Sequence, residues 1–302
     1  MTRLYWQVYK NLEKEFLQLA GSIHIDDKQL EVYSMKIADL LIRTVIEIEA
    51  IAKELYLSNA GTVFPDEEMY FDTVCMKHLD SLWNLDKKVV LVVAPDLYLE
   101  KEVNKVLMPL HKASKRGTSS AMWNRAYQAV KHNRVKELTK GNIKNLLAAL
   151  AALYVLNLYF RDYKMDKVSQ DDAKKIDGSF GSELFAVKIH NPDGIRTDGV
   201  YIKKADYDEC VYIYDFESEY KRITMDALRA LNDYSNREIQ KILVEKIRER
   251  TSQGLELTEE WLDKERIKAN TQIYPVKDYD VQKKLSVLGK LIYSLELNKC
   301  QY

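Results

Sequence analysis

Apolar positions recur at helical spacing through most of the first half of the chain. Between residues 4 and 21, an apolar side chain returns every three or four positions, which is typical of one buried face of an amphipathic helix. The same spacing predicts a longer helix over residues 27–58, capped by Asp26 or Asp27. A third helix is expected over residues 65–85. Because each helix has one apolar side to bury, the pattern predicts a helical bundle.

Two further helices complete this first part of the chain. One begins near Met122 and carries the charged residues discussed below. The other follows Asn142, which can cap it, and contains an apolar run from Leu146 to Phe160. This run is shorter than the roughly 18 apolar residues that a membrane span needs, so we expect a buried core helix and no membrane contact. The first residues do not resemble a secretory signal, which favours a cytoplasmic location.

The hydrophobic pattern changes after residue 163. Residues 164–181 are polar with few apolar positions, and they are the best candidate for a linker. Short alternating or apolar segments then follow between turn signals and predict a small antiparallel meander. These segments are residues 184–189, 199–203 and 210–214.

Helical spacing returns in the last third of the chain, where helices are expected over residues 225–231, 236–250, 258–269 and 281–297. The predicted fold class is therefore mainly α. An N-terminal helical bundle of residues 1–163 is followed by the linker, and residues 182–302 form a small α+β domain of unknown role with the meander. Residues 88–94 are β-branched and are either a strand or an extended buried connection.

The charges of the chain are balanced overall but uneven locally. The 46 basic and 46 acidic side chains cancel, so the net charge favours no nucleic-acid partner. Between His111 and Lys144, however, nine lysines and arginines accompany a single acid, Glu137, which leaves an excess of eight positive charges. Such a segment can attract phosphate groups.

The sequence offers few groups for metal or cofactor chemistry. It has no glycine-rich phosphate loop, nucleophile elbow or kinase signature. The three cysteines are far apart and do not have metal-ligand spacing, so we expect reduced thiols, no metal site and no cofactor. These cysteines are Cys75, Cys210 and Cys300.

One helix of the basic segment carries a pair of residues suited to phosphate chemistry. Arg125 and His132 are seven positions apart, and seven steps of about 100° bring a helix back to within about 20° of its starting direction. Both side chains therefore share one face, with Gln128 between them. A guanidinium binds two nonbridging phosphate oxygens, and an imidazole can move a proton to or from a ribose or leaving oxygen. Neighbouring candidates for RNA contact are Asn124, Gln128, Lys131 and Arg134.

The segment from Trp123 to Arg134, followed by a long helix rich in Leu and Ala, resembles the signature region of HEPN-like helical proteins, with an Arg-x6-His motif. The resemblance covers residues 1–163 only. It implies a helical bundle that dimerises through the motif helices and acts as a metal-independent endoribonuclease in toxin or defence systems. Arg125 and His132 match the two named catalytic positions. A second copy across a two-fold axis would supply both a general acid and a general base.

One position departs from the family pattern. Active members commonly have Asn, Asp or His directly after the arginine, whereas this chain has Ala126. Three hypotheses therefore stay open. The first is an RNA-binding protein, and a metal-independent endoribonuclease, of a bacterial defence or toxin system. The others are a non-catalytic nucleotide- or RNA-binding module and a structural protein in which this helix forms a dimer seam. The sequence indicates neither an RNA preference nor a neutralising partner.

Overall fold

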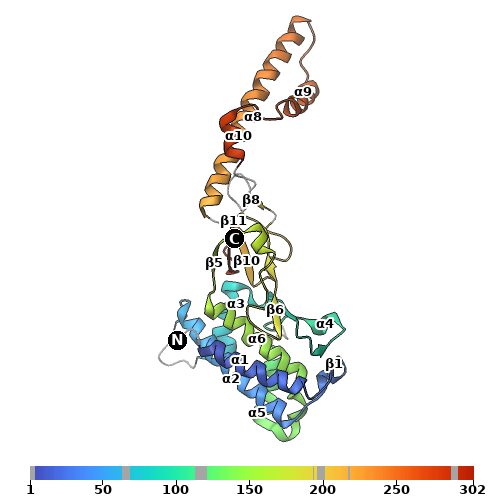
Figure 1. The fold of residues 1–302 in the computed structure, drawn as a ribbon, viewed down its shortest axis with the longest axis vertical. Coiled ribbons are helices and arrows are strands. Elements are labelled where there is room, and N and C mark those ends of the chain that lie inside the picture. The colour runs from blue at the N-terminus through green and yellow to red at the C-terminus, as the bar shows by residue number, and fades with distance from the viewer. Residues whose placement is uncertain are drawn as a thin grey trace.

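The structure is a computed structural model that describes residues 4–62, 69–112, 121–192, 194–195, 201–216, 218–286 and 292–302. Its elements form three parts (Figure 1). The N-terminal helices make a helical body, small sheets lie beside that body, and a long helix projects away from the sheets. The protein is thus mainly α with a small α+β part, as the sequence predicts.

Helix α6 (Ile143–Arg161) is the centre of the helical body. Its first turn is capped by Asn142, whose side chain accepts a hydrogen bond from the backbone N of Asn145 at 3.0 Å. The helix is long and apolar enough to cross a membrane, but most of its side chains are buried inside the body, where it serves as the core helix. The helices packed against it are α1 (Leu4–Ala20), α2 (Met35–Ser58) and α5 (Met122–Glu137).

Helix α2 begins later than its hydrophobic spacing predicts, because its cap is Ser34 and not Asp26 or Asp27. The Ser34 hydroxyl accepts a hydrogen bond from the backbone N of Ile37 at 3.1 Å. Asp27 instead accepts hydrogen bonds from the backbone N of Lys101 and a neighbouring residue, which fixes a distant loop. The segment before α2 forms strand β1 (Ile25–Asp26), which pairs with β3 (Leu97–Tyr98), and the short helix η1 (Gln29–Glu31).

The third predicted helix is shorter than expected. It starts with a π-helical turn, η2 (Phe71–Cys75), and continues as α3 (Met76–Trp83). It ends at Asn84, which adopts a left-handed conformation with φ 50°, and the short helix η3 (Leu85–Lys87) follows. The predicted start of this helix, at residues 65–68, lies outside the described residues.

Residues 88–94 contain a strand, β2 (Val90–Val92). It pairs antiparallel with β4 (Val106–Leu107), which follows the short helix α4 (Glu102–Lys105). On its other side it pairs antiparallel with β6 (Phe185–Val187). Because β6 comes from the second half of the chain, this small sheet joins the two halves.

A second sheet has four strands in a non-sequential order. In space they are β5 (Met165–Ser169), β11 (Ile292–Leu297), β10 (Tyr212–Phe216) and β7 (Ile189–His190). The pairs of β11 with β5 and with β10 are antiparallel, whereas β7 and β10 are parallel. The segments predicted to form a meander are therefore separated: β6 joins the other sheet, and β8 (Gly194–Ile195) pairs with β9 (Tyr201–Ile202).

Residues 164–181, expected to link two domains, belong to the folded body. They contain β5 and the short helix α7 (Gln170–Ala173). One continuous core runs from α1 through α6 to β10 and β11, so the expected boundary does not separate two cores. The physical reason is strand pairing: β5 is polar in sequence because it is an edge strand, and its hydrogen bonds go to β11, more than 120 residues further along the chain.

The buried carboxylate of Glu13 on α1 ties the end of this segment to the helical body. It accepts hydrogen bonds from the Tyr9 hydroxyl at 2.8 Å and from the backbone N of Glu183 at 2.9 Å and of Leu184 at 3.1 Å. Lys10 forms an ion pair with its other oxygen. Burial opposes ionisation, but the hydrogen bonds, led by that from Lys10, outweigh it and hold the pKa of Glu13 below its ordinary value.

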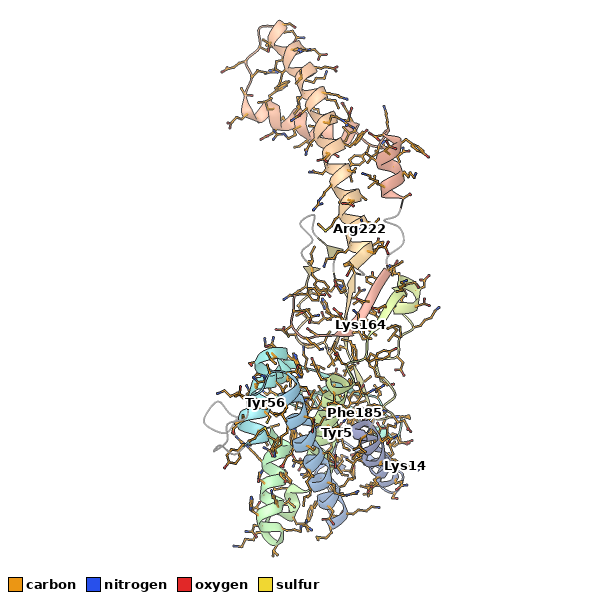
Figure 2. The ribbon with its side chains drawn as sticks, turned by 90° about the vertical axis from the view of Figure 1, so that its left-hand side faces the viewer. Tyr5, Lys14, Tyr56, Lys164, Phe185 and Arg222 are labelled. Carbon is orange, nitrogen blue, oxygen red and sulfur yellow. The ribbon has the colours of Figure 1, made fainter. Side chains whose placement is uncertain are left out.

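Residues 218–286 form an arm that projects from the sheet (Figure 1). Its main element is α8 (Ser218–Ser252), which at 1.5 Å per residue is about 52 Å long. Helices α9 (Glu259–Gln272) and α10 (Tyr279–Leu285) pack against α8. Figure 2 shows the arm from the side, with Arg222 near the base of α8.

The arm differs from the helices that the sequence predicts there. The two helices expected over residues 225–231 and 236–250 are one helix, α8, and the helix expected over residues 281–297 is divided into α10 and strand β11. A small core of its own holds the arm together. Its buried members are Tyr234, Ile273, Val276 and Val281.

Candidate functional site

Helix α5 is held against the body by one buried face. Trp123, Tyr127 and Val130 recur at helical spacing, and all three are buried. The indole of Trp123 also donates a hydrogen bond to the carbonyl of Pro109 at 2.7 Å. These contacts fix the rotation of the helix, and they determine which of its polar residues face outward.

Arg125 and His132 lie on the outward side of α5. Both side chains are exposed, and Gln128 between them is half-buried. The dihedral angles are helical up to His132, and the helix is interrupted only at Asn133, where φ is −148° and ψ is 62°. The helix is therefore regular between the two residues, and they leave it on the same side, about 10 Å apart along the axis.

A groove with a volume of about 760 Å³ runs along this side of α5. Arg125 lies in its wall, together with small side chains of α5. His132 is not among the lining residues, but it lies one turn beyond Ala129 on the same stripe of the helix. The groove is lined by Glu31, Tyr33, Met122, Arg125, Ala126, Ala129, Thr139, Lys140, Asn142, Lys144 and Asn145.

The charged residues of the groove are mainly cationic. Arg125, Lys140 and Lys144 line it, and Glu31 is the acid among the described lining residues. Glu31 is already engaged, since it accepts a hydrogen bond from the Asn142 amide at 2.8 Å and lies 3.8 Å from the Lys144 ammonium. Arg125 has no ion pair within the described part of the chain. The guanidinium is therefore free to bind an anionic ligand from solution.

The wall opposite α5 is built by the start of α6 and the short helix η4 (Leu138–Lys140). The Asn145 amide donates to the carbonyl of Lys140 at 2.9 Å, which fixes η4 to α6. The loop that carries Tyr33 is held beside them by a β-bridge between Tyr33 and Asn142. The positions of Lys140 and Lys144 are therefore defined by the backbone on either side of the α6 cap.

None of the site residues predicted from the sequence lies in this opposite wall. In the sequence, Lys140 and Lys144 stand out only as members of the basic segment. A usable signal is present, because the two lysines flank Asn142, the predicted helix cap, and so must lie at the exposed start of a helix. Tyr33 gave no such signal, since its contact with Asn142 joins residues more than 100 positions apart.

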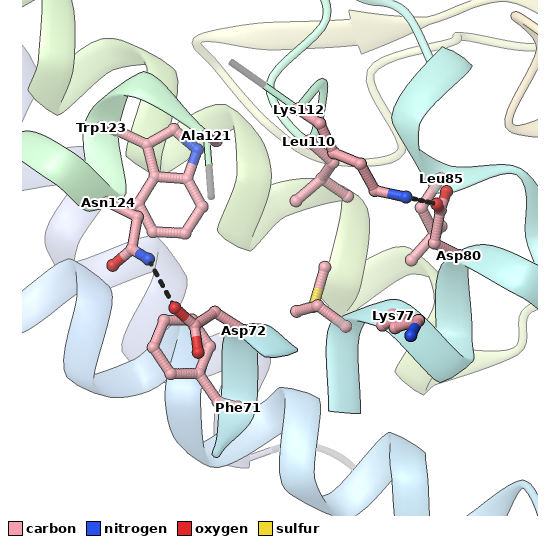
Figure 3. Close-up of a pocket in the computed structure, with 11 residues that line it drawn as sticks. Phe71, Asp72, Lys77, Asp80, Leu85, Leu110, Lys112, Ala121, Trp123 and Asn124 are labelled. Atoms are coloured by element: carbon pink, nitrogen blue, oxygen red, sulfur yellow. Dashed lines mark hydrogen bonds and ion pairs between the residues drawn. The ribbon is translucent and has the colours of Figure 1, made fainter. Parts of the chain in front are cut away.

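Asn124, a predicted RNA contact, points towards Asp72 (Figure 3), and it is not among the residues that line the groove. It is only 2% exposed, and its amide donates to the carboxylate of Asp72 at 3.3 Å. One helical step of about 100° separates it from Arg125, which turns it towards Asp72 of η2. The pocket around it has a volume of about 40 Å³, enough for about one water molecule, and it also contains the ion pair of Lys112 with Asp80.

The two other predicted cationic contacts already have partners within the chain. The Lys131 ammonium lies 5.2 Å from the centre of the Tyr127 ring, in a cation–π contact. The Arg134 guanidinium pairs with Asp39 of α2 at 2.9 Å. Both side chains stay near the surface, but neither lines the groove that contains Arg125.

Comparisons of the chain with protein-family models, with curated proteins and with solved structures gave no match. The resemblance of residues 1–163 to HEPN-like proteins is thus carried by the segment around Arg125 and His132 alone, and it stays a prediction. The class of site that the geometry defines is an open cationic groove beside a helix, with an exposed imidazole one turn beyond it. Such a groove suits a phosphate-bearing ligand.

Proposed function

We propose that the groove beside α5 binds RNA through its phosphates. One observation supports this most: Arg125, Lys140 and Lys144 line an open groove in which the described acid, Glu31, is already bound to other groups. Tyr33 adds a ring that is 49% exposed in the same groove, and an exposed aromatic ring can stack on an unpaired base. Cationic side chains next to an aromatic ring favour single-stranded RNA over a simple phosphate ion.

We further propose that two copies of the chain cleave the bound RNA without a metal ion. Arg125 would bind the nonbridging oxygens and stabilise the charge that develops on the phosphate. His132 of one copy takes the proton of a ribose 2′-hydroxyl, whose oxygen attacks the phosphorus. A protonated His132 of the other copy gives its proton to the 5′-oxygen as the P–O5′ bond breaks. The products are a 2′,3′-cyclic phosphate and a free 5′-hydroxyl.

The setting that we propose is the cytoplasm of a bacterium, in a defence or toxin system. This follows from the resemblance to HEPN-like proteins, whose members carry an arginine and a histidine on one helix. The alternative of a non-catalytic RNA- or nucleotide-binding module rests on Ala126, which occupies the position directly after Arg125 and is buried. Both forms of the proposal use the same groove, and the cleavage experiment below distinguishes them.

RNA binding is tested by fluorescence anisotropy with a labelled single-stranded RNA over a range of salt concentrations. The Arg125→Ala variant and the double variant Lys140→Ala/Lys144→Ala should each bind several-fold more weakly, and the salt dependence should fall by about one unit of slope for each lost phosphate contact. Arg248→Ala is the matched control, because Arg248 is exposed on the arm. Equal affinities for Arg125→Ala and Arg248→Ala would remove the binding proposal.

Cleavage is tested by incubating purified protein with mixed RNA in EDTA. Wild-type protein should produce fragments that end in a cyclic phosphate, and His132→Ala should not. His111→Ala is the matched control, since His111 is also exposed but lies outside α5. If wild-type protein binds RNA and leaves it intact, the non-catalytic module is the correct form. If His132→Ala cleaves as fast as wild type, the catalytic assignment is wrong.

A second candidate function, a dimer seam, is favoured by exposed apolar side chains beside the groove. Met122 is 63% exposed and lines the groove together with Tyr33, and Met35, two positions after Tyr33 in the chain, is 51% exposed. Apolar side chains gathered next to a polar groove are typical of a protein interface. Sedimentation velocity of Met122→Glu tests this proposal: a wild-type homodimer should dissociate in the variant while its helical circular dichroism is retained.

A further inference from the structure

Three side chains with different metal-binding atoms come together beside the four-stranded sheet. His190 ends strand β7, where it lies opposite Ile213 of β10. Asp206 begins the turn that leads into β10, and Cys210 ends it. The donor atoms of these three residues all lie within 4.8 Å of one another. Nδ1 of His190 is 2.9 Å from a carboxylate oxygen of Asp206, and the thiol of Cys210 is 3.8 Å from the other oxygen.

The imidazole of His190 has an unused ring nitrogen in the protein interior. Its side chain is completely buried, yet Nε2 has no hydrogen-bond partner within the described part of the chain. Buried polar atoms in folded proteins almost always have a partner, so an unpartnered one calls for an explanation. Cys210 is also buried, whereas the Asp206 side chain is 44% exposed. The cluster is therefore enclosed on the histidine side and open to solvent at the aspartate.

The backbone around the cluster is fixed by buried hydrogen bonds. The turn from Asp206 to Cys210 is closed by a bond from the Cys210 N to the Asp206 carbonyl at 3.2 Å. The buried amide of Asn298 donates to the carbonyls of Tyr207 at 2.6 Å and Cys210 at 3.0 Å. The Lys88 ammonium, also buried, donates to the same Cys210 carbonyl at 3.0 Å. Two donor residues thus lie at the ends of one rigid turn, and the third lies on an adjacent strand.

We propose that His190, Asp206 and Cys210 bind a divalent transition-metal ion of the zinc class. Imidazole nitrogen, carboxylate oxygen and cysteine thiolate are the ligands that zinc uses in proteins, and the sulfur excludes magnesium and calcium as the natural occupants. In a tetrahedral zinc site the donor atoms lie about 3.5 Å apart, so the cluster needs to contract by about 1 Å at its widest separation. Binding releases the proton of the Cys210 thiol to solvent.

Three protein ligands leave a fourth position for water or another ligand, on the open side next to Asp206. The ion would join the end of β7 to the turn before β10. The site does not depend on RNA binding, because its residues lie at β7 and before β10 in the sheet part, whereas the groove residues lie on α5 and its neighbours in the helical body. Figure 1 shows β10 and α5 in these two separate parts. The three residues do not form a metal motif in the sequence, since His190 is sixteen positions before Asp206 and ends a strand, whereas Asp206 lies in a turn.

The experiment uses cobalt(II) as a coloured substitute for zinc. The protein is stripped with a chelator and titrated with cobalt, and the charge-transfer absorption of a cobalt–thiolate bond is recorded. The double variant Cys75→Ser/Cys300→Ser leaves Cys210 as the single cysteine. We expect this variant and wild type to give the band at one equivalent of cobalt per chain. Zinc should displace the cobalt, whereas millimolar magnesium or calcium should not.

Cys210→Ser should abolish the band, and His190→Gln and Asp206→Asn should each weaken binding at least tenfold. Asp206 is partly exposed, so its variant is the one expected to keep the native circular dichroism. Zinc should raise the Tm of the wild-type protein by more than it raises that of Asp206→Asn. No thiolate band in Cys75→Ser/Cys300→Ser, or a band that persists in Cys210→Ser, would overturn the proposal whether or not the other variants fold.

Discussion

Arg134 in the last turn of α5 forms an ion pair with Asp39 of α2, with a guanidinium nitrogen 2.9 Å from a carboxylate oxygen. The pair lies on the far side of the interruption at Asn133 from His132. It joins the last turn of α5, beyond this interruption, to the body. Arg134 and Arg125 therefore differ in one important respect: only Arg134 has an internal carboxylate partner among the described residues.

Because Arg134 is already paired with Asp39, we predict that it contributes little to RNA binding. Its two side chains are 38% and 54% exposed, and exposed pairs contribute between zero and about 1 kcal/mol to stability. Arg134→Ala should lower the free energy of unfolding by no more than this amount and weaken RNA binding less than Arg125→Ala does. Urea denaturation and anisotropy measure the two effects. Asp39→Ala is the control, with the same small loss of stability. An affinity loss for Arg134→Ala as large as that for Arg125→Ala contradicts the prediction.

We predict that substitutions of Asn142 affect the free energy of unfolding and the affinity for RNA in different ways. Its side chain caps α6 and also donates to Glu31. Asn142→Ala should therefore lower the free energy of unfolding by about 1 kcal/mol through loss of the cap. Asn142→Asp keeps a capping oxygen but replaces the donor to Glu31 by a second carboxylate, so it should bind RNA more weakly than Asn142→Ala. Denaturation midpoints and anisotropy on the same samples measure the loss of the cap and the loss of affinity.

We predict that the folded protein loses stability in acid because of the buried carboxylate of Glu13. Its pKa in the folded protein is below the ordinary value of 4.5. The stabilisation it provides is therefore fully present above that value, and it is lost as the pH falls through the lower pKa of the folded state. Glu13→Gln should be less stable than wild type by about 1–3 kcal/mol at neutral pH, because the ion pair with Lys10 is removed.

Thermal unfolding between pH 7 and pH 3 tests this prediction. The difference between wild type and Glu13→Gln should shrink as the pH falls below about 4.5, since wild-type Glu13 then becomes neutral as well. Glu15→Gln on the same helix is the control. Glu15 pairs with Arg43 at the surface, so its substitution should have a smaller effect at neutral pH. A difference for Glu13→Gln that does not depend on pH would exclude the carboxylate as its cause.

Because α6 lies at the centre of the core, we predict that shortening one of its side chains strongly lowers the free energy of unfolding. Leu150 is completely buried, and Leu150→Ala should lower the free energy of unfolding by about 2–5 kcal/mol through lost contacts and a cavity. Leu255 in the arm is 50% exposed, and Leu255→Ala should change stability by less than about 0.5 kcal/mol. Urea denaturation followed by circular dichroism compares the two. Similar losses for both variants would show that α6 does not form the core.

The parts of the fold that the sequence predicted well depend on local periodicity. The apolar run of residues 146–160 predicts α6 as a buried core helix, and the spacing of Arg125 and His132 predicts that they share one side of α5. Both conclusions need only residues within one helix. Helix α2 shows the limit of this reasoning, because apolar spacing continues through residues 27–34 although Asp27 binds a distant loop there.

The parts of the fold that differ from the sequence predictions depend on contacts between residues far apart in the chain. Strand β5 is polar in sequence, and its pairing with β11 cannot be inferred from its own composition. In the same way, the alternation in β11 overlaps with a helical spacing, so a single helix was expected over residues 281–297. The cluster of His190, Asp206 and Cys210 forms because β7 and β10 are parallel neighbours, and the sequence placed these residues in an antiparallel meander.

The arm leaves and re-enters the molecule at a single place, because α8 follows β10, β11 follows α10, and these two strands are hydrogen-bonded neighbours. Of the described arm residues, only Tyr220 belongs to the main core. Insertions with closely spaced ends are well tolerated, since they do not alter the packing of the host. A change in the length of the arm should therefore leave the body unchanged, and the arm is a suitable position for a fluorescent tag.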